Sequence, residues 1–138
     1  MRVTGTAQHE AWMARTSPPV EEFRADLWSV SVPIPDSPLR YTLTYLIAAQ
    51  DGLVVVDPGW DTDAGWNALA EGLKAAGASP ADVTGIVVTH IHPDHHGLSA
   101  GLRARSGACV AIIREPAVDR RQVLPGISPN IGLQAARG

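Results

Sequence analysis

The sequence predicts an α/β fold in which helices cover a β-sheet and polar residues gather at the strand ends. Three observations lead to this fold class. Two apolar segments flank an Asp-Gly turn, a helix-periodic segment follows them, and a continuous β-branched run comes next. Strands and helices in this order are typical of layered α/β domains, whose ligand sites lie at the carboxyl ends of strands.

The first 25 residues are polar and lack a sustained period of 2 or 3.6 residues. We interpret 1–25 as a loosely docked polar N-terminal arm and 26–138 as part of one domain. In 27–34 apolar and polar residues alternate up to a proline, as in a strand with one buried face.

A β-hairpin is predicted over 41–57. Its two strands, 41–48 and 53–57, flank a turn that contains Asp51 and Gly52. Asp-Gly is expected there because it supplies the positive-φ positions of a tight hairpin turn.

An amphipathic helix is predicted over about 62–76, because apolar residues recur at i, i+3, i+4 and i+7. Asp61 can cap its start and Gly77 its end. A short helical turn is then predicted at Ser79 and Pro80, which have the order of an N-cap residue and a first-turn proline.

The run 85–89 is continuously β-branched, as expected of a strand buried on both faces. A further helix from about 95 to 106 and a strand over 108–113 are predicted after it. Cys109, the single cysteine, lies in an apolar run and is interpreted as a small buried residue. The predicted core consists of apolar residues from the sheet and its covering helix: Leu46, Val54, Val56, Leu69, Leu73, Ile86, Val88 and Ile112.

Composition narrows the class of partner. The chain has 11 basic and 14 acidic residues, a formal charge of −3 and no basic stripe, so nucleic acid is not an expected partner. No apolar run approaches the length of a membrane span or of a signal-peptide core, so we expect no membrane partner and a cytoplasmic protein.

Four of the five histidines lie within 90–96, directly after the strand predicted to be buried. His90 and His92, separated by one residue in extended backbone, point the same way and can bind one cation, while Ile91 is expected to point into the core. A solvated histidine-rich loop is the alternative, but it would not require such clustering directly after a buried strand.

Asp94 and His95 follow across a proline, where the chain turns into a helix, so they can face a second cation. Imidazole nitrogen together with a carboxylate suits zinc, with iron or manganese as alternatives. His96 would point elsewhere and is interpreted as a residue that supports the ligands or lies on the surface.

The order His-x-His-x-Asp-His in "HIHPDH", residues 90–95, resembles the signature of the metallo-β-lactamase-fold hydrolase superfamily. The segment 51–60, "DGLVVVDPGW", resembles the strand and turn that carry the Asp-x-Gly of this family, here with Asp57 and Gly59. The resemblance extends from about residue 27 to residue 113.

This resemblance implies a hydrolytic metal centre. His90 and His92 would bind the first metal, Asp94 and His95 the second, and Asp57 would organise the site; a turn residue without a chemical role is the alternative for Asp57. The metals lower the pKa of a shared water and polarise the bond attacked, while Asp94 can orient the hydroxide or move a proton as a catalytic residue. Small-molecule β-lactams, thioesters, lactones and phosphodiesters are substrates in the superfamily.

A full domain of this family is a four-layer αβ/βα sandwich, whose second half supplies a third histidine, a bridging aspartate and a last histidine. This chain has no histidine after His96, and Asp119 follows the motif too closely to serve as the bridge. Residues 114–138 resemble the beginning of the next loop and helix. We therefore interpret the sequence as the N-terminal half of the fold, which leaves one sheet face bare for a complementary half or a second copy.

Three functions remain open. The first is a metal-dependent hydrolase that needs its other half. The second is a non-catalytic remnant or interaction module with weak metal binding. The third is an iron-dependent oxidoreductase on the same scaffold; His92 counts against its diiron branch, which typically has glutamate there, but a mononuclear iron dioxygenase stays open.

Overall fold

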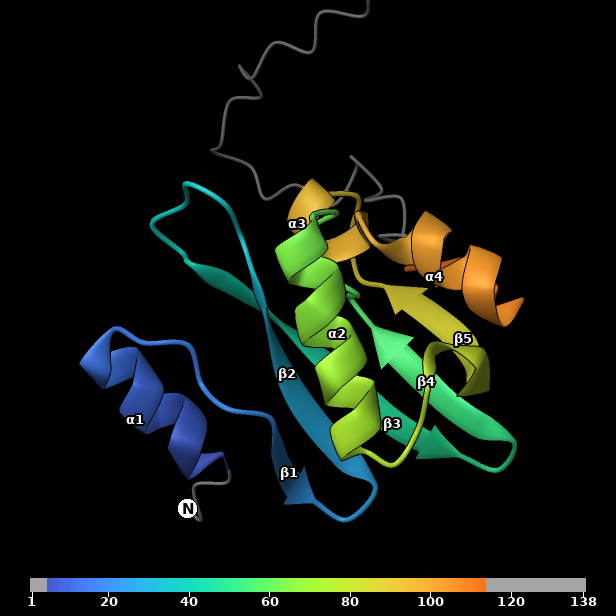
Figure 1. The fold of residues 1–138 in the computed structure, drawn as a ribbon, viewed down its shortest axis with the longest axis horizontal. Helices are drawn as coiled ribbons and strands as arrows, with labels where there is room; N and C mark the ends of the chain where they lie inside the picture. The colour runs from blue at the N-terminus through green and yellow to red at the C-terminus, as the bar shows by residue number, and fades with distance from the viewer. Residues whose placement is uncertain (1–4, 114–138) are drawn as a thin grey trace, which may run out of the picture.

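The computed structural model describes residues 5–113, which contain a six-stranded sheet with the order β1-β2-β3-β4-β5-β6 (Figure 1). The first four strands pair antiparallel, and β5 and β6 are added in parallel. The elements in chain order are α1 (Thr6–Ala14), β1 (Glu21–Arg24), β2 (Leu27–Pro33), β3 (Tyr41–Ala49), β4 (Gly52–Val56), α2 (Asp63–Ala75), the 3₁₀ helix η1 (Pro80–Asp82), β5 (Val83–Val88), α3 (Pro93–His96), α4 (Ser99–Ser106) and β6 (Cys109–Ile112).

The predicted hairpin is confirmed as β3 and β4, which pair from Tyr45 with Val56 to Ala49 with Gly52. Gly52 has φ +145°, and a Cβ there would lie 2.3 Å from the carbonyl oxygen of Asp82, so only glycine fits. The prediction of positive φ at the aspartate of the turn is wrong, because the glycine is the single turn residue in the left-handed half of φ space.

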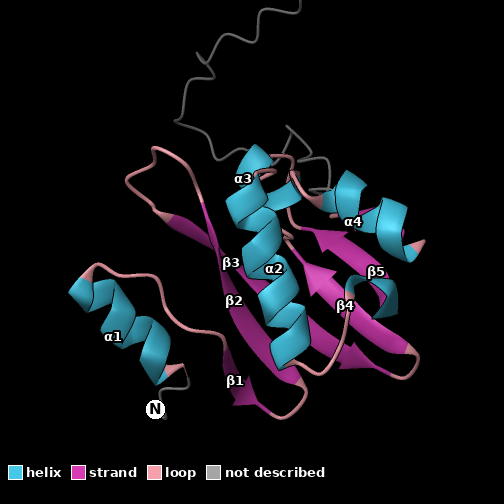
Figure 2. Cartoon of the chain, viewed as in Figure 1, coloured by secondary structure: helices cyan, strands magenta, loops and turns pink. Residues whose placement is uncertain are grey.

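Helix α2 covers the sheet, mainly over β2 (Figure 2). Its N-cap is Thr62, whose Oγ1 accepts a hydrogen bond of 3.0 Å from the backbone N–H of Gly65. The predicted cap, Asp61, is therefore wrong by one residue. Gly77 follows the helix with φ +75°, as the sequence predicts for its end.

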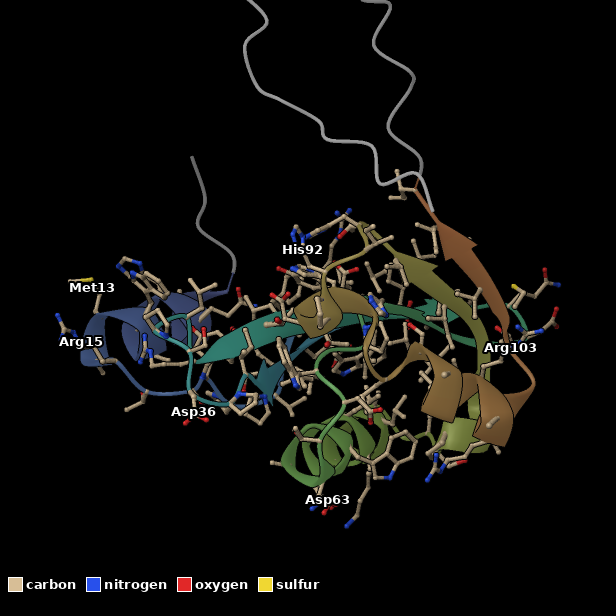
Figure 3. All side chains as sticks on the ribbon, turned by 90° about the horizontal axis from the view of Figure 1, so that it is seen from above. Met13, Arg15, Asp36, Asp63, His92 and Arg103 are labelled. Carbon is tan, nitrogen blue, oxygen red and sulfur yellow. The ribbon has the colours of Figure 1, made fainter. Side chains whose placement is uncertain are left out.

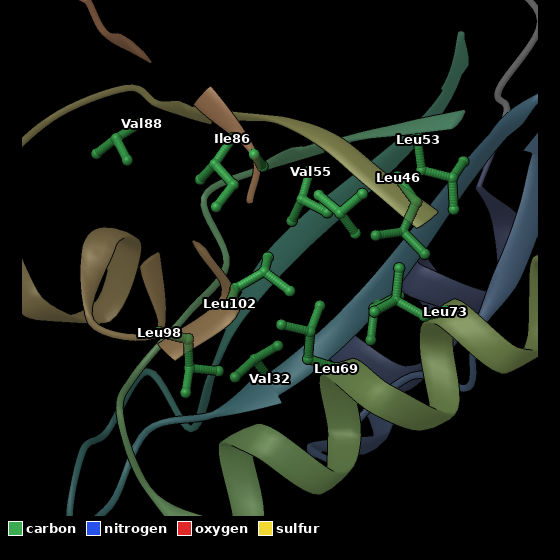
Figure 4. Close-up of a cluster of buried hydrophobic side chains, with 13 residues drawn as sticks. Val32, Leu46, Leu53, Val55, Leu69, Leu73, Ile86, Val88, Leu98 and Leu102 are labelled. Atoms are coloured by element: carbon green, nitrogen blue, oxygen red, sulfur yellow. The ribbon is translucent and has the colours of Figure 1, made fainter. Parts of the chain in front are cut away.

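The core lies between the sheet and α2 with α4 (Figure 4). Five of its predicted members are buried: Leu46, Leu69, Leu73, Ile86 and Val88. For β4 the wrong face was predicted to be buried. Leu53 and Val55 are buried, whereas the predicted core residues Val54 and Val56 are half-buried. Four consecutive apolar residues give no alternation from which to choose the inward face.

The strands at the end of the sheet are more exposed than predicted. Ile112 is 53% exposed and Cys109 is exposed, because both belong to β6, an edge strand of the described sheet. The predictions that these two residues are buried are wrong. In the run 85–89, predicted to be buried on both faces, Gly85, Ile86 and Val88 are buried, whereas Val87 and Thr89 are half-buried.

One sheet face carries the helices that follow β4. In Figure 3, α2 and α4 lie on the same side of the sheet. On the opposite face Ile47 is 40% exposed, in agreement with its pairing to half-buried Val54. Within residues 5–113 no helix has the length and apolar character needed to cross a bilayer.

The N-terminal arm contains two regular elements that the sequence does not predict. Strand β1 pairs with β2, with Glu21 opposite Ser29, and the side chain of Gln8 on α1 donates a hydrogen bond of 2.6 Å to the Ser29 hydroxyl. Helix α1 buries only Ala11, so no periodic apolar stripe marks it. Residues 114–138, the rest of the predicted half-domain, lie outside the described residues.

Candidate metal centre

The histidine cluster lies at the carboxyl end of β5, where the chain leaves the sheet. His90 and His92 belong to the loop after the strand, and Pro93 starts α3, with the N–H of His95 donating to the His92 carbonyl at 2.9 Å. The helix predicted from about 95 to 106 is instead two helices, α3 and α4, of which α3 has only one turn.

The side chains predicted to bind metal come together. The rings of His90 and His92 have centroids 4.7 Å apart, and those of His90 and His95 have centroids 3.9 Å apart. His95 Nε2 lies 3.3 Å from Asp94 Oδ2. His90 and His92 are exposed, so the cluster is open to solvent (Figure 3 labels His92).

Asp57 lies beneath the cluster at the end of β4 and is 6% exposed. Its Oδ1 accepts from the backbone N–H of Thr89 at 2.8 Å, and its Oδ2 accepts from the Thr89 hydroxyl at 2.7 Å. His95 Nδ1 lies 2.9 Å from the same Oδ2. Asp57 adopts φ +51°, a left-handed conformation that aspartate tolerates better than most residues. One carboxylate thus connects β4, the loop after β5 and α3.

This contact sets the chemistry of His95. Because a carboxylate only accepts hydrogen bonds, Nδ1 of His95 carries the hydrogen and a neutral ring leaves Nε2 as a bare acceptor. His95 Nε2 and Asp94 Oδ2 lie 3.3 Å apart and are then both acceptors. A proton or a cation between them would give each acceptor a partner. The pair is therefore suited to a positive ligand.

Three threonines that the sequence does not single out support the cluster. Thr89 contacts His90 Nδ1 at 3.0 Å as well as Asp57. Thr42 donates to Asp94 Oδ2 at 3.4 Å, and Thr44 donates to the Asp57 carbonyl at 2.6 Å. The sequence could have indicated two of them: Thr42 and Thr44 occupy buried positions of β3, where an apolar residue is expected.

A close backbone contact positions α3. The N–H of Leu98 donates to the carbonyl of Gly59 at 3.0 Å, and a Cβ on Gly97 would lie 2.7 Å from both Asp61 N and the Pro93 carbonyl oxygen. Glycine at position 97 therefore lets the turn after β4 approach α3.

Ile91 and His96 differ from the four predicted ligands in their surroundings. Ile91 is 74% exposed, so the prediction that it enters the core is wrong, because the chain has already left the sheet. His96 is exposed, and its side chain makes no hydrogen bond to any residue within 5–113.

The side chains of the cluster are of the types that bind a divalent cation, but too few of them converge on one point. Imidazole nitrogens and a carboxylate are the ligand set of zinc, iron or manganese sites. In the described part of the chain, however, no three His, Cys, Asp or Glu side chains are arranged to hold one ion. Further donors are needed for a closed coordination shell.

The chain matches known proteins over its central part. The profile described as Metallo-beta-lactamase superfamily matches residues 37–127, which include both Asp57 and the histidine cluster. Among solved structures, a metallo-beta-lactamase family protein from Thermus thermophilus is 35% identical with a TM-score of 0.56, over 60% of this chain and 27% of that one.

Two further solved structures resemble the chain to a similar degree. The Cronobacter sakazakii metallo-beta-lactamase with a HARLDQ motif is 26% identical, with a TM-score of 0.54 over 66% of this chain and 33% of that one. MIM-1 from Novosphingobium pentaromativorans is 25% identical, with a TM-score of 0.53 over 68% and 31%. The chain thus covers between 27% and 33% of these three proteins. The predicted fold class is confirmed.

Proposed function

Because this chain belongs to the metallo-β-lactamase superfamily, we propose that it carries half of the metal centre of a hydrolase of that fold. The observation that carries the proposal is the convergence of the His90, His92 and His95 rings, with Asp94, at the carboxyl end of β5. This is the end of the sheet at which α/β folds place their ligands.

His90 and His92 would hold one ion, and Asp94 and His95 a second, with zinc favoured by the donor set. Such ions, when bound, supply an acidified water and an electrophile for hydrolysis of an ester, thioester, lactam or related bond. Asp94 would orient the hydroxide or move a proton, since its carboxylate lies within the cluster, held by the Thr42 hydroxyl at 3.4 Å and 3.3 Å from His95 Nε2. Asp57 positions His95 through Nδ1.

The remaining ligands would come from a complementary part or from a second copy of the chain. The lack of a three-ligand group within 5–113 favours this division of the site. By itself, the chain would then bind metal weakly and show no turnover. With the remaining ligands in place, the site would act as a hydrolase. We expect a small-molecule substrate and a cytoplasmic location.

The proposal is tested by titrating the isolated chain with zinc in a calorimeter and assaying ester, thioester and lactam probes. We expect weak, substoichiometric binding that falls in His92→Ala and is unchanged in His9→Ala, which removes an exposed histidine of α1. Each lost ligand weakens the site, and hydrolysis also requires a fully held hydroxide, so turnover should be negligible throughout.

Equal zinc binding in His92→Ala and the unaltered chain would contradict the assignment of the cluster. Chelator-sensitive turnover by the isolated chain would contradict the division of the site and would show that further ligands are already present.

A further inference from the structure

A second potential site lies between α1 and the loop that joins β2 to β3. A pocket of about 490 Å³ is lined there by Trp12, Arg15, Pro38 and Arg40. This volume is in the range of small-molecule sites, and the lining combines an aromatic ring with two guanidinium groups. None of these residues belongs to the histidine cluster.

Neither arginine has a carboxylate partner among residues 5–113. The ion pairs found within residues 5–113 involve histidine, so neither Arg15 nor Arg40 pairs with a described carboxylate. Nη1 of Arg40 is buried and has no hydrogen-bond acceptor among the described residues. A buried charged donor without an acceptor is costly, and two unpaired cations at one pocket favour an anion there.

Aromatic rings surround the same guanidinium. The Arg40 Cζ lies 5.6 Å from the centroid of the Trp12 ring and 5.8 Å from that of Tyr41. Trp12 is nevertheless 54% exposed, so much of its ring remains free to contact a ligand. A planar apolar group can pack on this ring while its acidic group meets the guanidinium.

We propose that this pocket binds the carboxylate of a small organic acid whose planar apolar part packs on Trp12. This ligand site goes beyond the proposed function, because its lining residues lie outside the histidine cluster. Binding of the acid itself requires only Arg15, Arg40 and Trp12, so it can be tested without metal or turnover.

The test is a titration of the ¹⁵N-labelled chain with benzoate, followed by the indole N–H of Trp12 and the Nε–H of Arg40 in NMR spectra. Benzamide is the neutral control of the same shape. We expect saturable shifts with benzoate and none of that size with benzamide, and binding about tenfold weaker in Arg40→Gln because a charged hydrogen bond is lost.

Arg15→Gln is the second variant, since Arg15 is an exposed residue at the end of α1 and its replacement should leave the fold intact. Arg103→Gln, on α4, changes the charge equally and should leave binding unchanged (Figure 3). Equal shifts with benzamide, or unaltered benzoate binding in both Arg40→Gln and Arg15→Gln, would overturn this proposal while leaving the zinc titration unaffected.

Discussion

Replacement of Asp57 by alanine removes the carboxylate that connects β4, the loop after β5 and α3. Three hydrogen-bonding groups lose their acceptor: the N–H and hydroxyl of Thr89, and Nδ1 of His95. Alanine would also have to adopt φ +51° at this position. The lost hydrogen bonds and the strained backbone both lower the stability of the folded state.

The magnitude can be worked from these contacts. One hydrogen bond to a charged group contributes about 1.5–3 kcal/mol, but Thr89 and His95 are half-buried and regain water, so the three bonds are not additive. The left-handed conformation adds about 1 kcal/mol for alanine. We expect the free energy of unfolding to fall by about 3–5 kcal/mol in Asp57→Ala. Asparagine keeps the shape of the side chain and tolerates positive φ, so in Asp57→Asn we expect the free energy of unfolding to fall by only about 1–2 kcal/mol.

Urea unfolding followed by far-UV circular dichroism measures these losses, and Asp61→Ala is the matched control. Asp61 is an exposed aspartate of the same turn, so its replacement should change stability by less than about 0.5 kcal/mol. A loss below about 1 kcal/mol in Asp57→Ala, or equal losses for alanine and asparagine, would refute the reasoning about this network.

Further outcomes follow from packing and charge. Gly97→Ala, whose Cβ would lie 2.7 Å from two backbone atoms, should lower the free energy of unfolding by about 2 kcal/mol in urea; unchanged stability would contradict the close contact. Leu69→Ala should cost about 2–5 kcal/mol and Ile112→Ala under about 1 kcal/mol in the same assay, because the first is fully buried and the second is 53% exposed; equal costs would contradict the core assignment. The hydroxyl and N–H of Ser79 lower the pKa of Asp82, so this carboxylate stabilises the fold above its unfolded pKa and ceases to do so as pH falls through its folded pKa. Urea unfolding at pH 7 and pH 3 should therefore show a smaller acid-induced loss of stability in Asp82→Asn, and an equal loss would count against the contact.

Much of the fold could be predicted because local signals agree with the tertiary structure. The Asp-Gly turn predicts the β3–β4 hairpin, and the spacing of Leu69 and Leu73 predicts α2. The position of the histidine cluster after β5 follows from a β-branched run that ends at a strand boundary. In each case a short stretch of sequence determines where the element lies.

The features that could not be predicted depend on contacts between distant segments. Nothing in a run of four apolar residues shows that Val55 rather than Val54 faces the core, because pairing with Leu46 decides it. Cys109 is exposed because no strand pairs with the outer edge of β6 within 5–113, although its sequence neighbours are apolar. The role of Thr89 depends on Asp57, which lies 32 residues away in the sequence.

Zinc K-edge X-ray absorption on the zinc-loaded chain tests the central claim most directly, because it reports the ligands rather than the activity. A ligand shell at about 2.0–2.1 Å with the outer scattering of at least two imidazoles is expected. The imidazole scattering should decrease in His92→Ala and stay unchanged in His9→Ala. A shell of oxygen scatterers alone, or imidazole scattering that is the same in His92→Ala, would contradict the metal centre.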